Sequence, residues 1–336
     1  MTAFENSPAI AVRERYHEVV SDQWPVFVEP QPDELLSSWV HRVGFANGIA
    51  ARSFGRVLGF SGGMWSPSLD MNFQADAVSV LSAHTGVSLP RLSAMTLKGS
   101  PLKRLLLPLR DDGRRCGSAW LQFCPQCLTK DAQPYFRRQW RLATRISCPH
   151  HRCGLRDRCP SCRSRIAPFD QVALIPQHYC ARCGFDLRNA SKVPVSPAAQ
   201  LLDQCIFDIC TLEATTGSLG RGSLVRRLLH SPRIGRSDRG SSLANLCASA
   251  RIRCIERLTT QAGDWLTDDD DIYNSHWRRS ILLMGGLAPL IGLLAARLDR
   301  RHQRQVRSNH RKRTADLSAL LQAYLRVADR RAIGKS

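Results

Sequence analysis

Four pairs of cysteine and histidine residues, each with two residues between its members, constrain the fold of this chain more than any other feature. The gaps of 20 residues between the first two pairs and 17 residues between the last two suit structural zinc ribbons, in which two hairpin-like knuckles fold back to close one tetrahedron. The spacing therefore predicts two consecutive zinc sites. Their ligands are Cys124, Cys127, Cys148 and His151 in the first site and Cys159, Cys162, Cys180 and Cys183 in the second.

Thiolate and imidazole are the donors that zinc takes in closed, four-coordinate sites. Three thiolates with one imidazole, or four thiolates, leave no position for water, so both sites are expected to build structure rather than catalyse. Such a site contributes on the order of 10 kcal/mol to folding in zinc-finger peptides, so a chelator should unfold this region first. Buried free thiols are disfavoured by four knuckles in 60 residues, and disulfides need an oxidising compartment.

The first 30 residues carry six charged side chains between Glu5 and Asp22 and no apolar core of signal-peptide length. We therefore expect a cytoplasmic chain, in which thiols stay reduced and paired cysteines bind metal. Six further cysteines are expected to be small core residues: Cys116, Cys153, Cys205, Cys210, Cys247 and Cys254.

Two neighbouring histidines, His150 and His151, could each be the ligand that pairs with Cys148. His151 is expected to be the ligand because it leaves two residues after Cys148, whereas His150 leaves only one. His178 lies two residues before Cys180 and could compete by position, but we interpret it as a solvated hairpin residue.

Positive charge is concentrated in two parts of the chain, whose formal net charge is +20. Residues 103–165 contain 15 Lys/Arg against 4 Asp/Glu, and residues 297–336 contain 12 against 3. This segregation is typical of a surface that binds a polyanion, and nucleic acid is the obvious one. Genomic base composition can explain why 42 of the 48 basic residues are Arg, but not where they lie. A membrane surface fits less well, since the basic tail lacks interleaved large apolar residues.

Outside the knuckles the pattern predicts mainly helix. Asp33 is expected to cap a helix with apolar residues at helical spacing, which ends at Asn47-Gly48, and a short helix follows at 53–58. Residues 75–97 predict two helices around a turn at Gly86, as in a helix-turn-helix. The second helix, with Arg91, is expected either to read DNA or to have a structural or protein-docking role.

The C-terminal part is expected to be helical at 198–214, 221–230, 242–262, 276–300 and 314–331. Ile281–Ala296 is apolar but short for a membrane span and is interpreted as buried helix. Asp268–Asp271 are expected to cap a helix in solvent rather than to bind a catalytic metal.

The expected fold is thus mainly α with small β zinc ribbons, in three parts. These are an N-terminal helical and helix-turn-helix region at 1–110, tandem zinc ribbons at 111–190, and a C-terminal helical domain with a basic tail at 191–336.

Five motifs follow one another in the first two parts: PDELLSSWVHRVGFANG, FCPQCL, PYFRRQWRLA, CPHHRCGL and CPSC. Over about residues 24–187 this series closely resembles the TniQ family of transposition-target selectors, in the order and spacing of apolar, aromatic and ligand positions. The last 150 or so residues agree only in being helical. The larger, TnsD-like relatives have a longer C-terminal part.

The resemblance implies an adaptor and not an enzyme. TniQ-like proteins combine a helix-turn-helix region with tandem zinc ribbons and connect a chosen target DNA, or an RNA-guided targeting complex on which a TniQ dimer sits, to an AAA+ ATPase that recruits the transposase. In mercury-resistance-type transposons a resolvase takes part as well. Carried over to this chain, the resemblance assigns two zinc ions to the eight ligands named above.

Two surfaces are then expected to meet partners. A basic face with Arg137, Arg138, Arg141 and Arg145 would lie against nucleic acid or its carrier complex, while Tyr135, Phe136 and Trp140 pack over the first zinc site. The ATPase would contact a polar rim formed by Asp33, Glu34, His41 and Arg42.

Two other classes compete with the adaptor. A zinc-ribbon and helix-turn-helix transcription regulator would share the charge and the motifs, but would bind one operator without an ATPase. A metal-dependent nuclease or transposase needs separated carboxylates around an open metal site, and no such spacing stands out, so enzyme activity ranks last. The carboxylates considered are Asp111, Asp112, Asp131, Asp203, Asp208 and Glu213.

Overall fold

A computed structural model describes residues 23–59, 69–71, 73–100, 102–109, 119–166, 171–217, 223–224, 228, 242–260, 272–305 and 321–325. These residues form helices joined by long loops, which confirms a mainly helical chain. Among them β pairing is limited to isolated bridges, such as Phe123 with Arg156 and Arg158 with Arg165. The small β ribbons expected around the metal ligands are therefore irregular loops in the part of the chain that is described.

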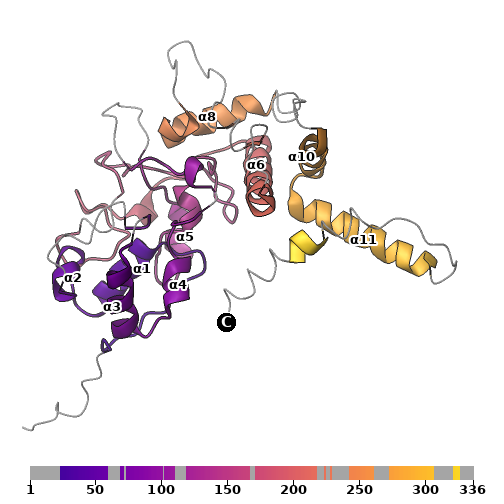
Figure 1. The fold of residues 1–336 in the computed structure, drawn as a ribbon. Coiled ribbons are helices and arrows are strands. Elements are labelled where there is room, and N and C mark those ends of the chain that lie inside the picture. The colour runs from indigo at the N-terminus through magenta and orange to yellow at the C-terminus, as the bar shows by residue number, and fades with distance from the viewer. Residues whose placement is uncertain are drawn as a thin grey trace, which may run out of the picture.

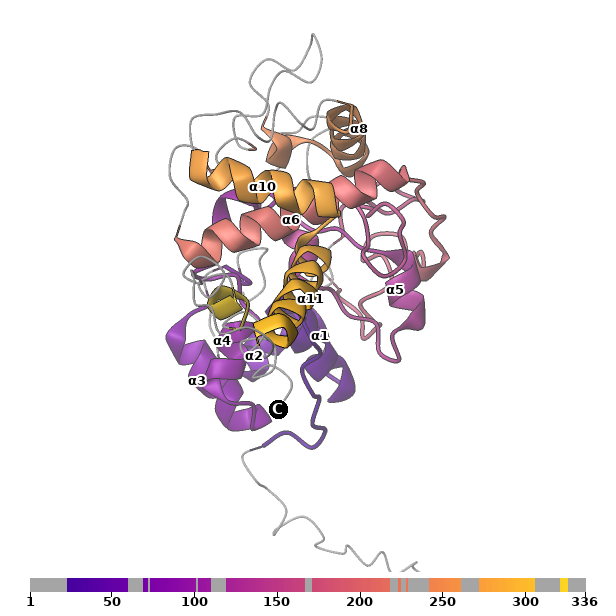
Figure 2. The ribbon, with the colours of Figure 1, turned by 90° about the vertical axis from the view of Figure 1, so that its right-hand side faces the viewer.

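The helices gather on two sides of the molecule (Figure 1). On one side lie α1 (Leu36–Ala46), α2 (Ala51–Val57), α3 (Ala75–Thr85) and α4 (Leu89–Ala94), and on the other α6 (Pro197–Thr216), α10 (Ile272–Met284) and α11 (Leu287–Gln305), with α8 (Ala248–Leu258) across α6. Figure 2, seen from the second side, has α11 in front. Loops with α5 (Pro125–Lys130) connect the two sides, and short 3-10 helices span Lys103–Leu105, Arg138–Arg141, Leu187–Asn189 and Leu243–Asn245.

Helix α1 forms where the apolar spacing predicts a helix. Trp39 and Val40 are fully buried in a cluster with Phe54 of α2, and the Trp39 indole N–H donates to the Val28 carbonyl at 2.8 Å. Asp33, however, does not cap the helix: its φ is +58° and its carboxylate accepts a hydrogen bond from the Gln139 N–H. The residue at the cap is Leu35, because the chain before α1 is held by the loop after α5.

The expected helical hairpin at 75–97 is present. Helix α3 ends at Gly86, whose φ of +70° is the left-handed conformation that glycine adopts without strain, and α4 begins after Ser88. Leu81 and Leu92 are buried in the same cluster as α1. The hairpin thus supports the N-terminal core, and DNA reading by α4, which is only six residues long, stays a prediction.

The larger core crosses the three expected parts. It joins Leu35 before α1 to Phe123 and Phe136 in the middle loops, and continues to Ile206 of α6 and Leu290 of α11. Boundaries at 110 and 190 stay a prediction, because the apolar contacts do not divide there.

The helix expected at 276–300 is broken into α10 and α11, which are bent by 96°. Gly285 and Gly286 lie at the break with φ of +73° and +137°, and the Asp208 carboxylate accepts from the Leu287 N–H at 2.8 Å, which satisfies one free donor at the start of α11. The interpretation of Ile281–Ala296 as one buried helix was wrong.

Exposure of the same segment agrees with this correction, since Leu283 is 85% exposed. In the described chain no single helix is long and apolar enough to cross a membrane; α10 and α11 meet that test only together, across their bend. Asp268–Asp271, Cys116 and most of the helices expected at 221–230 and 314–331 lie outside the described residues.

A close approach between α1 and α2 gives a first test of this packing. A Cβ added at Gly44 would lie 2.9 Å from the Phe54 ring and 3.0 Å from the Ile49 carbonyl oxygen, so Gly44→Ala should destabilise the fold by about 1–3 kcal/mol in urea unfolding. Gly292→Ala in α11 is the matched control, because nothing lies within 4 Å and alanine favours helix, by up to about 1 kcal/mol. Equal effects of the two changes would contradict the packing.

Candidate metal centres and the buried arginines

The first four predicted ligands come together in one cluster. The Nδ1 atom of His151 lies 3.6, 3.3 and 3.5 Å from the Sγ atoms of Cys124, Cys127 and Cys148, and the last two sulfurs are 3.5 Å apart. Zinc–sulfur bonds of about 2.3 Å place the sulfurs of a tetrahedral shell about 3.8 Å apart. The cluster therefore has close to the spacing that a four-coordinate metal ion requires.

The other four predicted ligands form the second cluster. Sγ of Cys159 lies 3.7 Å from that of Cys183, and Sγ of Cys162 lies 3.6 Å from that of Cys180. All four ligand atoms lie within 4.8 Å of one another. The first cluster is largely buried, whereas Cys183 of the second is exposed. Both clusters could hold a metal ion.

The thiols of each cluster are shifted in opposite directions: the pKa values of Cys127 and Cys148 are raised, chiefly by hydrogen bonds with Cys124, and that of Cys159 is raised by burial, whereas one thiol in each cluster has a lowered pKa. The pKa of the Cys124 thiol is lowered by neighbouring thiols, of which Cys127 has the largest effect. Burial raises the pKa of the Cys162 thiol, but hydrogen bonds, led by that of Ser164, outweigh it and bring the pKa to about 6. Because the thiolate is the metal-binding form, the lowered pKa of one thiol in each cluster suits a metal centre.

Three of the four knuckles end on the same backbone turn. The amide N–H groups of Arg152, Arg163 and Gly184 each donate to the carbonyl of the cysteine four residues earlier, at 2.8, 3.0 and 2.9 Å. All three residues have positive φ, of 50°, 60° and 71°. This turn brings the two ligands of each pair to the same side of the loop, which explains the regular spacing in the sequence.

A fifth sulfur lies beside the first cluster. Sγ of Cys153 is 3.6 Å from that of Cys124, so Cys153 is buried, as expected, but its thiol also contacts a ligand. Its place two residues after His151 was the available signal in the sequence. Cys205, Cys210 and Cys254 are buried as predicted, and Cys247 is half-buried.

His178 is not the solvated residue that we expected. It is buried, its ring contacts that of Tyr179, and it lies outside the second cluster. Burial lowers its pKa and that of His41 on α1, where the pKa falls to about 4. Both rings are therefore neutral parts of the packing near neutral pH.

The arginines of the expected basic face are mostly buried against carboxylates. Arg137 forms a two-point ion pair with Asp131, at 2.8 and 3.1 Å, and covers the Tyr135 ring at 4.2 Å. Arg141 is fully buried 3.6 Å from Asp70, which is also fully buried. Contact of Arg137 and Arg141 with nucleic acid stays a prediction; the Arg141 side chain is fully buried, and that of Arg137 is 10% exposed.

The remaining predicted nucleic-acid contacts differ in exposure. Arg145 is buried 3.7 Å from Asp203 of α6, and Arg138 is half-buried. Arg91 of α4 is exposed and pairs with Glu29 at 3.0 Å. Of the five predicted contacts, Arg91 is thus the one whose side chain is exposed, and its role also stays a prediction.

These pairs belong to a set of buried arginines that the sequence analysis missed. Arg251 lies 3.9 Å from Asp157 and donates to Gln122, and Arg278 of α10 binds Glu213 of α6 at 2.7 Å. The carboxylates could have indicated these pairs from the sequence. Glu213 falls on the apolar face of α6, where a buried charge needs a partner of opposite charge.

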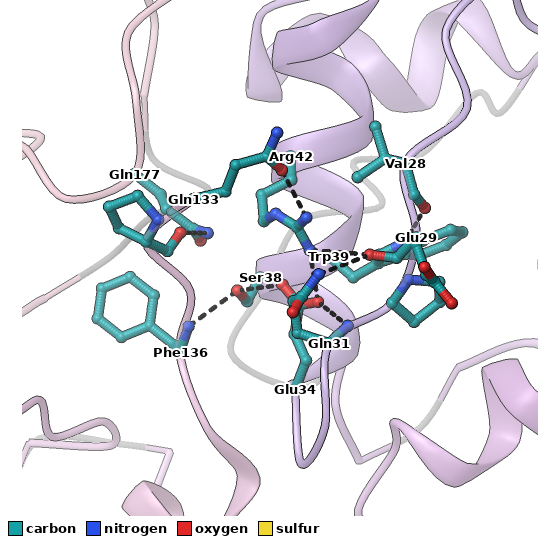
Figure 3. A network of polar contacts seen from close by, with 12 residues as sticks. Val28, Glu29, Gln31, Glu34, Ser38, Trp39, Arg42, Gln133, Phe136 and Gln177 are labelled. Carbon is teal, nitrogen blue, oxygen red and sulfur yellow. Dashed lines mark hydrogen bonds and ion pairs between the residues drawn. The ribbon is translucent and has the colours of Figure 1, made fainter. Parts of the chain in front are cut away.

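Of the expected polar rim near α1, Glu34, His41 and Arg42 are also internal, whereas Asp33 is exposed. Glu34 and Arg42 form a buried ion pair at 2.7 Å, and Arg42 donates to the Gln133 side chain at 2.6 Å (Figure 3). Ser38 links Glu34 to the Phe136 amide. The pair therefore joins α1 to the loop after α5, and an open groove of about 600 Å³ lies between that loop and residues 26–32.

The aromatic residues of the same loop pack as expected. Phe136 and Trp140 are fully buried with rings 6.1 Å apart, and Tyr135 is buried beneath Arg137. Their rings are therefore part of the core beside the first cluster rather than a surface for stacking bases.

Fold and clusters together define a helical protein whose middle loops close around two four-ligand centres. The TniQ family model matches residues 25–155, so this part of the chain is similar to the TniQ domain of a family linked to target selection in transposition. The match contains the whole first cluster and ends before the second. No curated protein matches the chain.

Proposed function

We propose that this protein directs transposon insertion by linking target DNA, or a targeting complex on DNA, to an AAA+ transposition ATPase and through it to the transposase. The observation that carries the proposal is the TniQ match over residues 25–155, which indicates a family for target selection in transposition. The two clusters support a scaffold role, because each offers four protein donors and so needs no water to complete its shell.

The donor sets fit zinc in both centres. Three sulfurs with one imidazole nitrogen, and four sulfurs, are the usual shells of structural zinc, and the interatomic distances are close to those of a tetrahedron. Bound zinc would cross-link the loops at Cys124, Cys148, Cys159 and Cys180. The protein's own part is to hold these loops as one rigid body beside α1, with the chain working in the cytoplasm.

A second candidate is a transcription regulator that uses α3 and α4 as a helix-turn-helix. The helical hairpin at 75–94 favours it, since its glycine turn and buried interface resemble those of DNA-binding hairpins. Such a regulator would protect one operator sequence without help from an ATPase, and footprinting on genomic DNA separates the two candidates.

An insertion assay tests the adaptor directly. Cells that carry a marked transposon, its transposase and its AAA+ ATPase are compared with and without the chain. We expect directed insertions to be lost without it and the full-length protein to bring down the ATPase. Insertions with the same frequency and the same sites in both strains would overturn the proposal.

A further inference from the structure

Exposed arginines gather at the second cluster, away from the buried arginines described above. Arg163 follows Cys162 directly, and Arg182 lies between Cys180 and Cys183. Both side chains belong to exposed residues. Since the sulfurs of the two knuckles are 3.6 and 3.7 Å apart, the cluster holds these two basic loops next to each other.

Two more arginines extend this surface. Arg165 pairs through its backbone with Arg158, opposite the knuckle turn, and is half-buried. Arg156 is close to Arg163: burial lowers the pKa of Arg156, and the charge of Arg163 lowers it further. Arg156 donates to Ser191 and Arg165 has an interaction of its own, so we restrict the name second-cluster arginines to the exposed Arg163 and Arg182.

Carboxylates do not neutralise this surface in the described part of residues 152–192. Asp157 accepts from the Ala248 amide at 2.7 Å and lies beside Arg251, and Asp186 is held by Arg188 at 2.8 Å. Neither Arg163 nor Arg182 has a carboxylate within 4 Å among the described residues. Positive charges therefore accumulate on this surface, whereas the buried arginines described above each have an acidic partner.

The backbone at Arg163 points to a role for its side chain. Its φ of +60° is a conformation that costs free energy for any residue with a Cβ, and the equivalent turn of the next knuckle has Gly184. Glycine would form the turn better, and the exposed Arg163 side chain adds nothing to the core. Strain retained at an exposed charged position suggests a binding function.

We propose that the second-cluster arginines contact the phosphate backbone of duplex DNA. Guanidinium groups bind phosphate with two parallel hydrogen bonds, and a rigid metal-held loop fixes them without ordering a flexible segment on binding. The inference deepens the proposed function and rests on it, since it assigns the contact with target DNA to a surface that lies outside the TniQ match.

The test measures affinity of the full-length, metal-loaded protein for a fluorescent DNA duplex over a range of salt. Arg163→Gly and Arg182→Gln are compared, alone and together, with a control that removes equal charge from exposed positions of α8, Arg253→Gln with Arg257→Gln. The slope of log K against log salt should become smaller by about one for each lost contact, so by about two in the double variant.

The glycine substitution separates binding from folding. Arg163→Gly should leave the melting temperature unchanged or raise it, because it relieves the positive φ. A salt slope equal to that of the wild type, or an equal loss in the α8 control, would overturn the proposal while leaving the adaptor function in place. If the wild type binds no duplex DNA but still directs insertion, this inference is wrong while the proposed adaptor function stands. If the protein binds an RNA duplex but no DNA duplex, the inference is also wrong and RNA replaces DNA as the partner.

Discussion

Replacing Cys148 with serine should lower the metal content from two zinc ions per chain to one and unfold the middle of the molecule. Cys148 is fully enclosed in the larger core together with Cys124 and Cys127, so the first cluster and the core depend on each other. A structural zinc site is worth on the order of 10 kcal/mol, comparable with the whole stability of a typical domain. The loss should therefore be visible in metal analysis and in thermal unfolding.

Cys162→Ser provides a graded comparison. The second cluster is partly exposed, with Cys183 on the surface, so its loss should release one zinc ion and open residues 159–183 to protease while the main unfolding transition persists. Cys247→Ser, at a half-buried thiol outside both clusters, serves as the control and should keep two zinc ions. A zinc-free protein with wild-type unfolding behaviour would refute the metal centres.

Asp70→Asn should destabilise the fold by about 3–5 kcal/mol, because it leaves the fully buried Arg141 without an opposite charge. The Asp70 carboxylate also accepts from the Ser37 amide and hydroxyl at 2.9 and 3.0 Å, which holds the start of α1. Burial raises the pKa of Asp70 and lowers that of Arg141 to about 10, so desolvation opposes the attraction within the pair. Removing one charge of the pair should then lower the free energy of unfolding more than removing both charges.

Urea unfolding of three variants checks this reasoning. The double variant Asp70→Asn with Arg141→Met should regain part of the stability that Asp70→Asn loses, since a methionine can fill the space without a charge. Asp76→Asn, at an exposed aspartate of α3, is the matched control and should change stability by less than about 0.5 kcal/mol. A single Asp70→Asn variant as stable as this control would show that the buried pair contributes nothing.

Local patterns predicted which eight cysteine and histidine side chains come together in two clusters. The eight ligands could be found because each knuckle is a short turn in which two residues separate the ligands, and the same turn recurs with positive φ at Arg152, Arg163 and Gly184. The apolar face of α1 and the turn at Gly86 were found for the same reason, since helical period and glycine conformation act within a few residues.

Contacts between distant segments were not predictable in the same way. Arg141 and Arg145 have the composition of a basic surface, but they are buried because Asp70 and Asp203 approach them from other parts of the chain. The break between α10 and α11 depends in part on Asp208 of α6. Net charge therefore indicated how many arginines the region holds, but not which of them face solvent.

The segment before α1 and the loop after α5 are interlocked. The Leu35 amide donates to the Phe136 carbonyl at 2.9 Å, the Arg138 amide donates to Asp33 at 2.7 Å, and Glu34 pairs with Arg137 through the backbone. Neither segment can be replaced by the corresponding segment of another protein without breaking the hydrogen bonds that hold the other segment. Recombination between relatives would have to move the leading helices and the first pairs of candidate metal ligands together, which is how far the family match extends.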